Sequence, residues 1–399
     1  MGERADAVVI GGGLVGLATA HALAERGRHV VVCEKEDRWA AHQSGHNSGV
    51  VHSGVYYTPG GLKATLATRA AAELPDLCAD WGVPYRRTGK LIVAVTESEL
   101  PRLRALAERG RANGVDVREL TGAQATEYEP HVRCVAALHV ASTGVCDFPA
   151  LARALAGRLE AAGADLRLST TVEAVVEQGS TVRVITDTGD LAAAHVINCG
   201  GLHSDRLLAP DVRRRIRIVP FRGEYWALRD DRRDLVRGLV YPVPDPDLPF
   251  LGVHLTRGID DTVHIGPNAV FALSREGYRR RDISIRDVLD AVAYGGTWRM
   301  ARRHAGTGIG EAVRSLMPRL AVRSVRRMLP EVTRHDLIPH PAGVRAQAVA
   351  ADGRPSDDFV IRHQGRITHV VNAPSPAATA CIPIGQQIAG TVTDHTPPA

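Results

Sequence analysis

The spacing of apolar residues at the start of the chain predicts a strand, a helix and a second strand. Mostly apolar runs cover Ala7–Ile10 and His29–Cys33, as expected for buried strands. Between them a glycine turn leads into Leu14–Arg26, where apolar residues recur at helical spacing. A strand–helix–strand unit of this kind is typical of a parallel sheet covered by helices.

The middle of the chain alternates between helical and strand patterns. Residues 41–61 follow neither period, and a long irregular segment in a compact domain is usually functional. A buried strand over His195–Asn198 runs into Cys199-Gly200-Gly201 and is expected to return to the first sheet. Helices are expected over Lys63–Trp81, Glu97–Asn113 and Phe148–Ala162, and strands over Lys90–Val95, Asp165–Leu168, Val172–Val175 and Val182–Thr186.

The second half of the chain predicts a different kind of sheet. From Ile216 to Gly266 the alternation of apolar and polar residues favours antiparallel strands, and helical patterns then dominate from Ile283 to Met328. Strands over Asp358–Ile361 and Thr368–Val371 precede a helix near Ile384–Val392. The predicted fold class is mixed α/β, with a Rossmann-type domain interwoven with an antiparallel-sheet domain. We assign residues 1–85, 146–212 and 336–399 to the Rossmann-type domain, and residues 86–145 and 213–335 to the other.

The charge of the chain limits the kinds of partner. The net charge of +5 and the pI near 9.0 describe a mildly basic protein. Arginine clusters at 213–215, 279–281 and 326–327 have no aromatic interleaving, so nucleic-acid binding is not indicated. A solvated basic surface, an anionic substrate and an anionic membrane surface each explain the surplus charge.

Cysteine spacing and the first residues bear on the cellular compartment. The six cysteines form no C-x-x-C pair, which argues against a disulfide framework and a zinc site and fits a reducing compartment. The chain enters a strand pattern at once, leaving no room for a signal peptide, and no apolar run approaches the ~18 residues of a membrane span. We expect a cytoplasmic protein, with peripheral contact at the inner membrane face as an alternative. Val313–Leu329 mixes arginine with aliphatic residues, as an interfacial helix would, although ordinary core packing gives the same pattern.

A glycine motif after the first strand indicates a dinucleotide. Gly11, Gly13 and Gly16 form G-x-G-x-x-G, which allows a tight turn, close approach of a pyrophosphate and close helix–strand packing. The N-terminus of the following helix offers free N–H groups to phosphates. Glu34, at the end of the second strand, is placed to accept hydrogen bonds from a ribose hydroxyl.

Two further segments favour FAD over NAD. After Glu34 the chain enters the irregular segment 42–49 rather than another regular unit, and its small and polar residues suit a loop beside a large cofactor. A second such segment, 372–379, precedes the last helix, whose N-terminus suits the flavin edge that becomes negative on reduction. Two distant segments fit a cofactor that lies extended across the protein. The candidate cofactor-binding residues are Gly11, Gly13, Gly16, Glu34, Lys35, Ser44, His46, Asn47, Ser48, Gly49, Val172, Gly200, Asn372, Pro374, Ser375, Pro376, Ala377 and Thr379.

Three histidines within residues 41–61 raise the question of a metal. His42 and His46 have helical spacing, but Ser44 and Gly45 disfavour a helix there. With no cysteine or carboxylate cluster beside them or beside His52, no metal site is expected.

Long stretches of the chain resemble one family. The sequence is similar to the L-2-hydroxyglutarate oxidase/dehydrogenase family, within the D-amino-acid-oxidase and glycine-oxidase superfamily of flavoproteins. The resemblance implies a glutathione-reductase-type FAD domain, an antiparallel-sheet substrate domain and oxidation of an L-2-hydroxy acid, L-2-hydroxyglutarate above all, to the 2-oxo acid. The matching stretches are residues 42–64, 220–228, 241–257, 263–270, 275–282, 341–349 and 372–385.

The resemblance also supplies a residue for the substrate carboxylate. Arg345, in GVRAQ, resembles the superfamily arginine with this role, and its planar fork suits a carboxylate. A dicarboxylic substrate needs a second anchor, for which Arg257 and Arg222 are candidates. Tyr57, like Tyr56 and Tyr225, is a candidate hydroxyl donor, with packing as the alternative role.

A histidine is expected to take the substrate's hydroxyl proton. His254 lies in an apolar strand of the presumed substrate sheet, and imidazole titrates near neutral pH. An orienting or core role for His254 is the alternative, with His52 and His46 as rival bases. The superfamily also uses histidine for covalent flavin attachment, for which His52 is the candidate.

Other functions remain to be separated from this one. A flavin oxidase for an amino or imino acid would share the carboxylate arginine, and a non-catalytic FAD module would share the glycine motif. The expected electron acceptor is oxygen or a quinone.

Overall fold

The first sheet carries the glycine motif. The computed structural model describes residues 4–245, 252–303 and 318–394. Within them, eight strands form a sheet in which β1 lies between β12 and β2, parallel to both. The strands are β10 (Val172–Gln178), β11 (Thr181–Thr186), β12 (Leu191–Asn198), β1 (Ala5–Ile10), β2 (Val30–Cys33) and β9 (Asp165–Arg167), in that order, with β20 (Ile367–Asn372) beside β12 and β19 (Val360–Gln364) beside β20.

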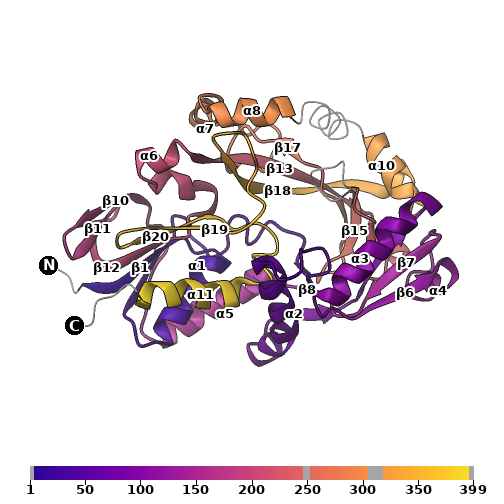
Figure 1. Ribbon diagram of the computed structural model, residues 1–399, viewed down its shortest axis with the longest axis horizontal. Helices are drawn as coiled ribbons and strands as arrows, with labels where there is room; N and C mark the ends of the chain where they lie inside the picture. The colour runs from indigo at the N-terminus through magenta and orange to yellow at the C-terminus, as the bar shows by residue number, and fades with distance from the viewer. Residues whose placement is uncertain (1–3, 246–251, 304–317, 395–399) are drawn as a thin grey trace.

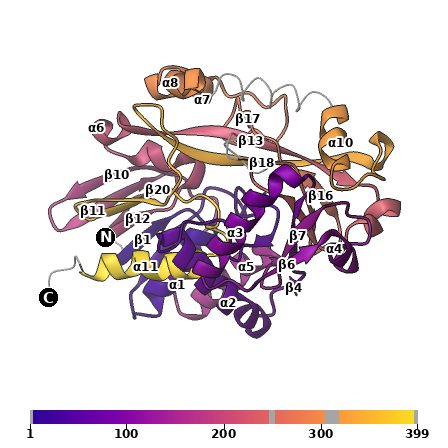
Figure 2. The same cartoon turned by 45° about the vertical axis from the view of Figure 1, so that its right-hand side comes forward.

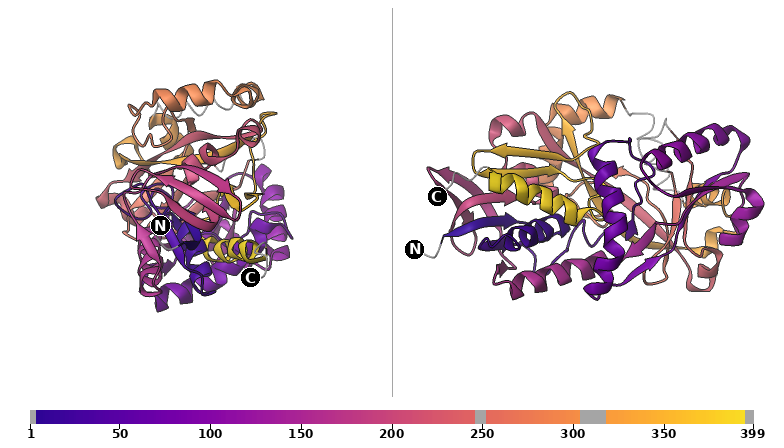
Figure 3. Two further views of the ribbon diagram at one scale, coloured as in Figure 1. Left: turned by 90° about the vertical axis from the view of Figure 1, so that its left-hand side faces the viewer. Right: turned by 60° about the horizontal axis from the view of Figure 1, so that its bottom comes forward.

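Helices cover one face of this sheet. Figure 1 shows α1 (Leu14–Ala24), α5 (Phe148–Ala161) and α11 (Cys381–Asp394) together below it. Their apolar residues form one buried cluster with β1, β2 and α2 (Leu62–Asp80). Small residues bring α1 and α11 close together, because a Cβ at Gly385 would lie 2.5 Å from the Ala18 carbonyl carbon. The two ends of the described chain lie on the same side of the molecule (Figure 3).

The second sheet is larger and mostly antiparallel. Nine strands of the described chain belong to it, and its longest pair is β13 with β18. The strands are β17 (Val270–Phe271), β13 (Ile216–Leu228), β16 (Val263–Gly266), β15 (His254–Arg257), β14 (Leu239–Pro242), β5 (Lys90–Ala94), β7 (Ala136–Val140) and β6 (Val117–Thr121), in that order, with β18 (Leu337–Ala350) beside β13.

Short elements complete the molecule. Figure 2 shows α7 (Ile285–Val292) and α8 (Gly295–Arg303) on the far side of β13 and β18 from the first sheet. A small sheet consists of β3 (Val50–Val51), β8 (Gly144–Cys146) and β4 (Tyr85–Arg87). The other helices of the described residues are α3 (Leu100–Ala112), α4 (Gly122–Tyr128), α6 (Pro210–Arg213) and α10 (Pro318–Arg326), and 3-10 turns cover Glu97–Glu99, Gly201–Leu207, Asp230–Leu235 and Arg334–Asp336.

The mixed α/β fold class and the return of residues 195–198 to the first sheet are confirmed, but one long strand was not expected. The pattern predicted no strand over Leu337–Ala350, and our division placed it with the first sheet, whereas β18 pairs with β13 in the second. Pro339 and Pro341 obscure the pattern, since proline disfavours strand interiors. Pro341 is accommodated where the β13–β18 register shifts, opposite Gly223–Tyr225.

The amphipathic pattern near residue 320 has a different role from an interfacial helix. Residues 313–317 lie outside the described part of the chain, while Val322, Val325, Met328 and Leu329 are buried in the core of the second sheet. Core packing therefore explains the described part of this pattern. No described helix is long and apolar enough to cross a membrane.

Candidate functional site

A large cavity lies between the two sheets. Its volume is about 1090 Å³, and it extends from Glu34 and Lys35 along the glycine turn to His254 and Arg345. Residues 373–379 line the same cavity as the glycine turn, although more than 350 residues separate them in the sequence. Its size exceeds the ~300–1,000 Å³ typical of small-molecule sites, as a long cofactor plus a substrate requires.

The glycine turn forms the floor of the cavity. Gly11 has φ +106°, and a Cβ there would lie 2.5 Å from the Cys199 carbonyl oxygen. A Cβ at Gly16 would collide with the Gly11 carbonyl oxygen, so helix and strand could not pack as they do. The first turn of α1 has no acidic side chain, and its N-terminus opens into the cavity through Gly13 and Leu14. These features suit a phosphate group.

Glu34 is tied to the backbone beside this turn. It is 8% exposed, and its carboxylate accepts hydrogen bonds from the N–H of Gly12 (2.6 Å) and the N–H of Glu36 (2.9 Å). A carboxylate has about four acceptor positions, so two remain for a ribose.

A charged cluster closes this end of the cavity. Glu276 lies 2.7 Å from both Lys35 Nζ and His203 Nε2, and Lys35 also pairs with Glu36. His42 Nε2 lies 2.8 Å from Glu36. We call Lys35, Glu36, His42, His203 and Glu276 the paired cluster; it joins the end of β2 to the 274–284 segment between β17 and α7.

The paired cluster also contains the one carboxylate–histidine group of the described chain with metal-ligand spacing. Glu36, His42 and Glu276 bring ligand atoms within 4.8 Å of one another. The Lys35 ammonium already contacts both carboxylates and supplies the positive charge that a metal ion would provide. Burial opposes ionisation of Glu276, but the hydrogen bonds from His203 and Lys35 outweigh it and hold the pKa of Glu276 well below its ordinary value.

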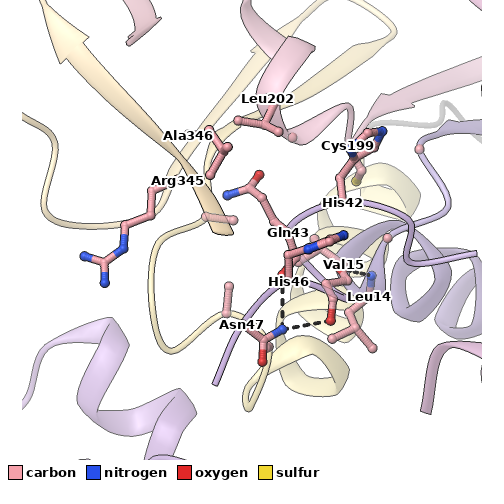
Figure 4. A pocket seen from close by; sticks show the side chains of 18 of the residues that line it. Leu14, Val15, His42, Gln43, His46, Asn47, Cys199, Leu202, Arg345 and Ala346 are labelled. Carbon is pink, nitrogen blue, oxygen red and sulfur yellow. Dashed lines mark hydrogen bonds between the residues drawn. The ribbon is translucent and has the colours of Figure 1, made fainter. Parts of the chain in front are cut away.

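The irregular segment is ordered by its own side chains. Asn47 Nδ2 donates to the carbonyl oxygens of Gln43 (3.1 Å) and Ser44 (2.8 Å), and Asn47 Oδ1 accepts the N–H of Gly49 (2.8 Å). Ser44 Oγ accepts the N–H of Leu14 at 3.0 Å, which ties the segment to α1. Figure 4 shows Gln43, His46 and Asn47 on the side of Leu14 and Val15, while Arg345 points away from them.

The C-terminal segment meets the same loop. Thr379 Oγ1 accepts the N–H of His52 at 3.1 Å, and Ser375 Oγ lies 3.2 Å from His52 Nε2. His52 Nδ1 is buried without a hydrogen-bond partner among the described residues. Burial, with the nearby charges of Lys90 and His254, lowers the pKa of His52 to about 3.

Arg345, Tyr225 and His254 come together at the far end of the cavity. Arg345 and Tyr225 line the wall from β18 and β13 and share a side-chain hydrogen bond. His254 is 7% exposed, and its Nδ1 lies 3.0 Å from the Gly252 carbonyl oxygen. A carbonyl only accepts, so Nδ1 carries the proton and Nε2 keeps its lone pair. Burial, followed by the charges of Lys90 and Arg345, lowers the pKa of His254 to about 3.

Six predicted residues do not line the cavity. Arg222 pairs with Glu224 (3.0 Å) and Arg257 with Asp261 (2.9 Å), so neither guanidinium faces the far end. The side chain of Asn372 is used between strands, since it donates to the Ser356 and Asp358 carbonyls. Gly49, Tyr56 and Tyr57 also lie outside the lining, and Tyr57 reaches it through a hydrogen bond to Ser375.

Sequence reasoning missed three residues of this end. Tyr241 lines the cavity, and its ring stacks on that of His254 with centroids 4.1 Å apart. Lys63 lines the cavity from α2, and Lys90 is buried behind Tyr241. Tyr241 lies in a proline-rich segment that was predicted as a turn. Lys63 and Lys90 each stand beside a leucine at the start of a predicted helix or strand, which gave no sign of a functional role. The scarcity of lysine in the chain was the available signal for these two.

The cradle fits FAD in shape and chemistry. The glycine turn leaves no room for side chains, the α1 N-terminus suits a pyrophosphate, and Glu34 retains acceptor capacity. The unpartnered Nδ1 of His52 and the 373–379 segment stand where the cavity continues toward His254. The remaining predicted cofactor residues, which also line the cavity, are Gly13, Lys35, Ser44, His46, Asn47, Ser48, Val172, Gly200, Pro374, Ser375, Pro376, Ala377 and Thr379.

Solved structures share the fold. An L-α-glycerophosphate oxidase from Mycoplasma pneumoniae with FAD bound superposes with a TM-score of 0.79 at 22% identity, covering 98% of this chain and 95% of that one. Glycine oxidase from Geobacillus kaustophilus gives a TM-score of 0.72 at 20% identity, covering 99% and 96%.

Sequence comparisons define the family. Residues 6–391 match the model described as FAD dependent oxidoreductase. Proteins named L-2-hydroxyglutarate dehydrogenase are 43% identical in Salmonella houtenae and 41% in Escherichia coli K12, covering 97% of this chain and 93% of each relative. The human mitochondrial protein of that name is 40% identical, covering 97% and 88%. The chain therefore belongs to the FAD-dependent oxidoreductases, in the family of these L-2-hydroxyglutarate dehydrogenases.

Proposed function

We propose that this protein oxidises L-2-hydroxyglutarate to 2-oxoglutarate. The observation that carries the proposal is the meeting of Arg345, Tyr225 and His254 at the end of a cavity that begins at a dinucleotide turn. The names of relatives about 40% identical over nearly the whole chain supply the substrate. The cavity residues supply a cation for a carboxylate, Arg345, and a base for a hydroxyl proton, His254.

Each side chain at the far end has one task. Arg345 holds the C1 carboxylate through paired N–H donors, and the Tyr225 hydroxyl fixes the arginine. His254 Nε2 accepts the hydroxyl proton, and its low pKa in the free site keeps the imidazole uncharged for that purpose. The substrate's carboxylates then raise the proton affinity of His254 by offsetting the charges of Arg345 and Lys90. Bound FAD supplies the acceptor for the hydride from C2.

Anaerobic mixing tests the proposal. We expect L-2-hydroxyglutarate to remove the visible absorbance of the bound flavin, with 2-oxoglutarate as the product. D-2-hydroxyglutarate, L-lactate, glycine and L-proline form the comparison panel. Rapid reduction by an amino acid and none by L-2-hydroxyglutarate would move the protein to the amino-acid oxidases.

The same preparation tests attachment of the flavin. Acid precipitation should release FAD into the supernatant, because the site is built for a bound dinucleotide. Flavin that stays with the precipitated chain, and is freed in a His52→Ala variant, would indicate a covalent link through His52.

We also propose that α7 and α8 touch an anionic membrane surface. The described part of this face exposes Ile283, Ile285, Leu289, Val292 and Trp298, and Ile285 is 75% exposed. Such a group of large apolar side chains exceeds the isolated ones normal on a surface. Exposed arginines in or next to α7 and α8 match anionic headgroups in charge; they are Arg281, Arg286, Arg299, Arg302 and Arg303.

Vesicle sedimentation tests this surface. Binding should occur with phosphatidylcholine vesicles that contain phosphatidylglycerol and weaken with salt, and Leu289→Asp should abolish it. Val176→Asp, at an exposed apolar position on β10, is the matched control. Binding would favour a quinone as the electron acceptor, while no binding at low ionic strength would remove this proposal and favour oxygen.

A further inference from the structure

Lysine is rare in this chain and is concentrated at the cavity. Of 49 lysine and arginine residues, the lysines are Lys35, Lys63 and Lys90 alone. Lys35 and Lys63 line the cavity, and Lys90 packs against Tyr241, which lines it. Arginine supplies nearly all other basic groups, so charge alone does not explain lysine at these places. The property that arginine lacks is the ability to lose its proton within the physiological range.

Lys90 differs from the other two in its surroundings. It is 2% exposed, and its Nζ has no hydrogen-bond partner among the described residues. The Nζ lies 4.3 Å from the ring centroid of Tyr241 and 5.2 Å from that of Tyr56. A buried ammonium paired only with aromatic rings is costly, which points to a use for its charge.

Tyr241 connects Lys90 to the proton acceptor. The His254 ring stacks on Tyr241 at 4.1 Å with the planes 21° apart, so it covers one face of the tyrosine. The Lys90 ammonium lies 4.3 Å from the centroid of the same ring, and because His254 occupies one face, we infer that the ammonium lies over the other. The stack places a cation directly behind the histidine that faces the substrate.

We propose that Lys90 is a positioning residue of this site: its buried ammonium, set behind Tyr241, keeps His254 uncharged and attracts the anionic substrate. The substrate's identity rests on the proposed function, but the charge effect applies to any dicarboxylate bound at Arg345. Because Lys90 does not line the cavity, it acts through the field at the site rather than by contact.

The groups that face Lys90 support this role. They are His52 and Tyr56 from the loop after β3, Tyr241 on β14 and His254 on β15, with Arg345 beyond His254. No carboxylate of the described chain pairs with the ammonium, so an arriving substrate supplies its first negative charges. Burial lowers the pKa of Lys90 to about 7, which makes the charge depend on pH near neutrality.

The pH dependence of ligand binding tests the inference. The probe is 2-oxoglutarate, titrated calorimetrically into the FAD-bound protein from pH 6 to pH 9.5. Lys90→Met should raise Kd about five- to tenfold at pH 6, as expected for the loss of one positive charge near the bound anion. At pH 9.5, where Lys90 is uncharged in the parent protein, the two Kd values should agree. Pyruvate, with one carboxylate, should show a smaller ratio.

Two further measurements separate charge from structure. The acid limb of the kcat/KM profile should move to higher pH in Lys90→Met, since one cation that disfavours protonated His254 is gone. Lys90→Arg should restore tight binding and keep it up to pH 9.5. A Kd increase of equal size at all pH values would indicate a packing defect and overturn the inference.

Direct titration of the lysines covers the case of variants that do not fold. Selective ¹³C labelling gives three Cε signals in the parent holoenzyme, and a soluble gadolinium reagent broadens those of the partly exposed Lys35 and Lys63. The surviving signal should titrate near neutral pH and move when 2-oxoglutarate binds. A surviving signal that is already that of a neutral amine at pH 6, or that does not move when 2-oxoglutarate binds, would overturn the inference, whereas failure of 2-oxoglutarate to bind at all would count against the proposed function.

Discussion

The two ends of the cavity use the same residue types in opposite ways. Near Glu34, a lysine, two histidines and two glutamates form the paired cluster, and Lys35 and Glu276 are each about one-third exposed. At the far end a lysine and two histidines meet tyrosines, Lys90 is almost fully buried, and no described carboxylate joins them. The difference indicates that the paired charges near Glu34 hold the two sheets together, whereas the unpaired positive charge at the far end is suited to bind an anionic ligand.

The pKa shifts follow this division. In the paired cluster the carboxylate Glu276 has a lowered pKa because cations surround it. At the far end burial lowers the pKa values of His52, His254 and Lys90, and the nearby charge of Lys90 lowers those of the two histidines further. The paired cluster stabilises the charged forms of Lys35, Glu36 and Glu276, whereas the far end disfavours charge on its two histidines and its lysine.

The largest expected effect is at His254. His254→Asn preserves size and some hydrogen bonding but removes the basic nitrogen, so flavin reduction should slow by ~10²–10⁴-fold with FAD still bound. Stopped-flow absorbance under anaerobic conditions measures it. A near-normal rate would transfer the proton-accepting role to His52 or His46.

Arg345→Lys should have the next largest effect. The charge remains but the planar fork is lost, so kcat/KM should fall by about 30- to 1000-fold, or ~2–4 kcal/mol. FAD content and thermal stability should barely change, because Arg345 is assigned to the substrate. Arg257→Lys tests the rival anchor, and its pairing with Asp261 outside the cavity predicts at most a small change. A comparable loss there, or unchanged kinetics in Arg345→Lys, would contradict our assignment.

The paired cluster should affect stability rather than the chemical step. Glu276→Gln removes the shared partner of Lys35 and His203, so the melting temperature should fall by a few degrees while the rate of flavin reduction by saturating substrate is retained. The lowered pKa of Glu276 stabilises the fold above pH 4.5 and loses that effect as pH falls below it. The difference in melting temperature should therefore be full at pH 6 and disappear in strong acid.

Acid should also reduce the stability that the far end contributes, but in a different pH range. His52 and His254 remain unprotonated in the fold down to about pH 3, while the unfolded chain takes up protons from about pH 6.5. Stability due to these groups is thus lost as pH falls from 6.5 toward 3. His254→Asn should flatten the stability profile in this range, whereas Glu276→Gln should flatten it only below pH 4.5. Identical profiles for the two variants would remove the distinction between the ends.

Local patterns predicted much of the fold. The glycine turn, α1, β2, the long α2 and α5 and the return strand at residues 195–198 depend on short-range rules of periodicity and turn chemistry. The strand β18 escaped these rules, because two prolines interrupt it and pairing with β13 over most of its length overrides their local preference. Because β18 was not predicted, Arg345 was identified through the family resemblance and not through strand periodicity.

The sequence by itself determined that this protein binds a dinucleotide and which residue types surround it, since a glycine turn and a helix N-terminus are local structures. The family resemblance supplied Arg345 as a candidate carboxylate anchor, and the position of His254 in an apolar strand made it a candidate proton acceptor. Only the tertiary structure decided which charges are already paired. Arg222, Arg257 and Lys90 are alike in the sequence as single cations in predicted strands. In the fold the first two meet carboxylates, whereas Lys90 Nζ lies against the rings of Tyr56 and Tyr241. Pairing depends on contacts between distant segments, and these contacts arise when the two sheets close around the cavity.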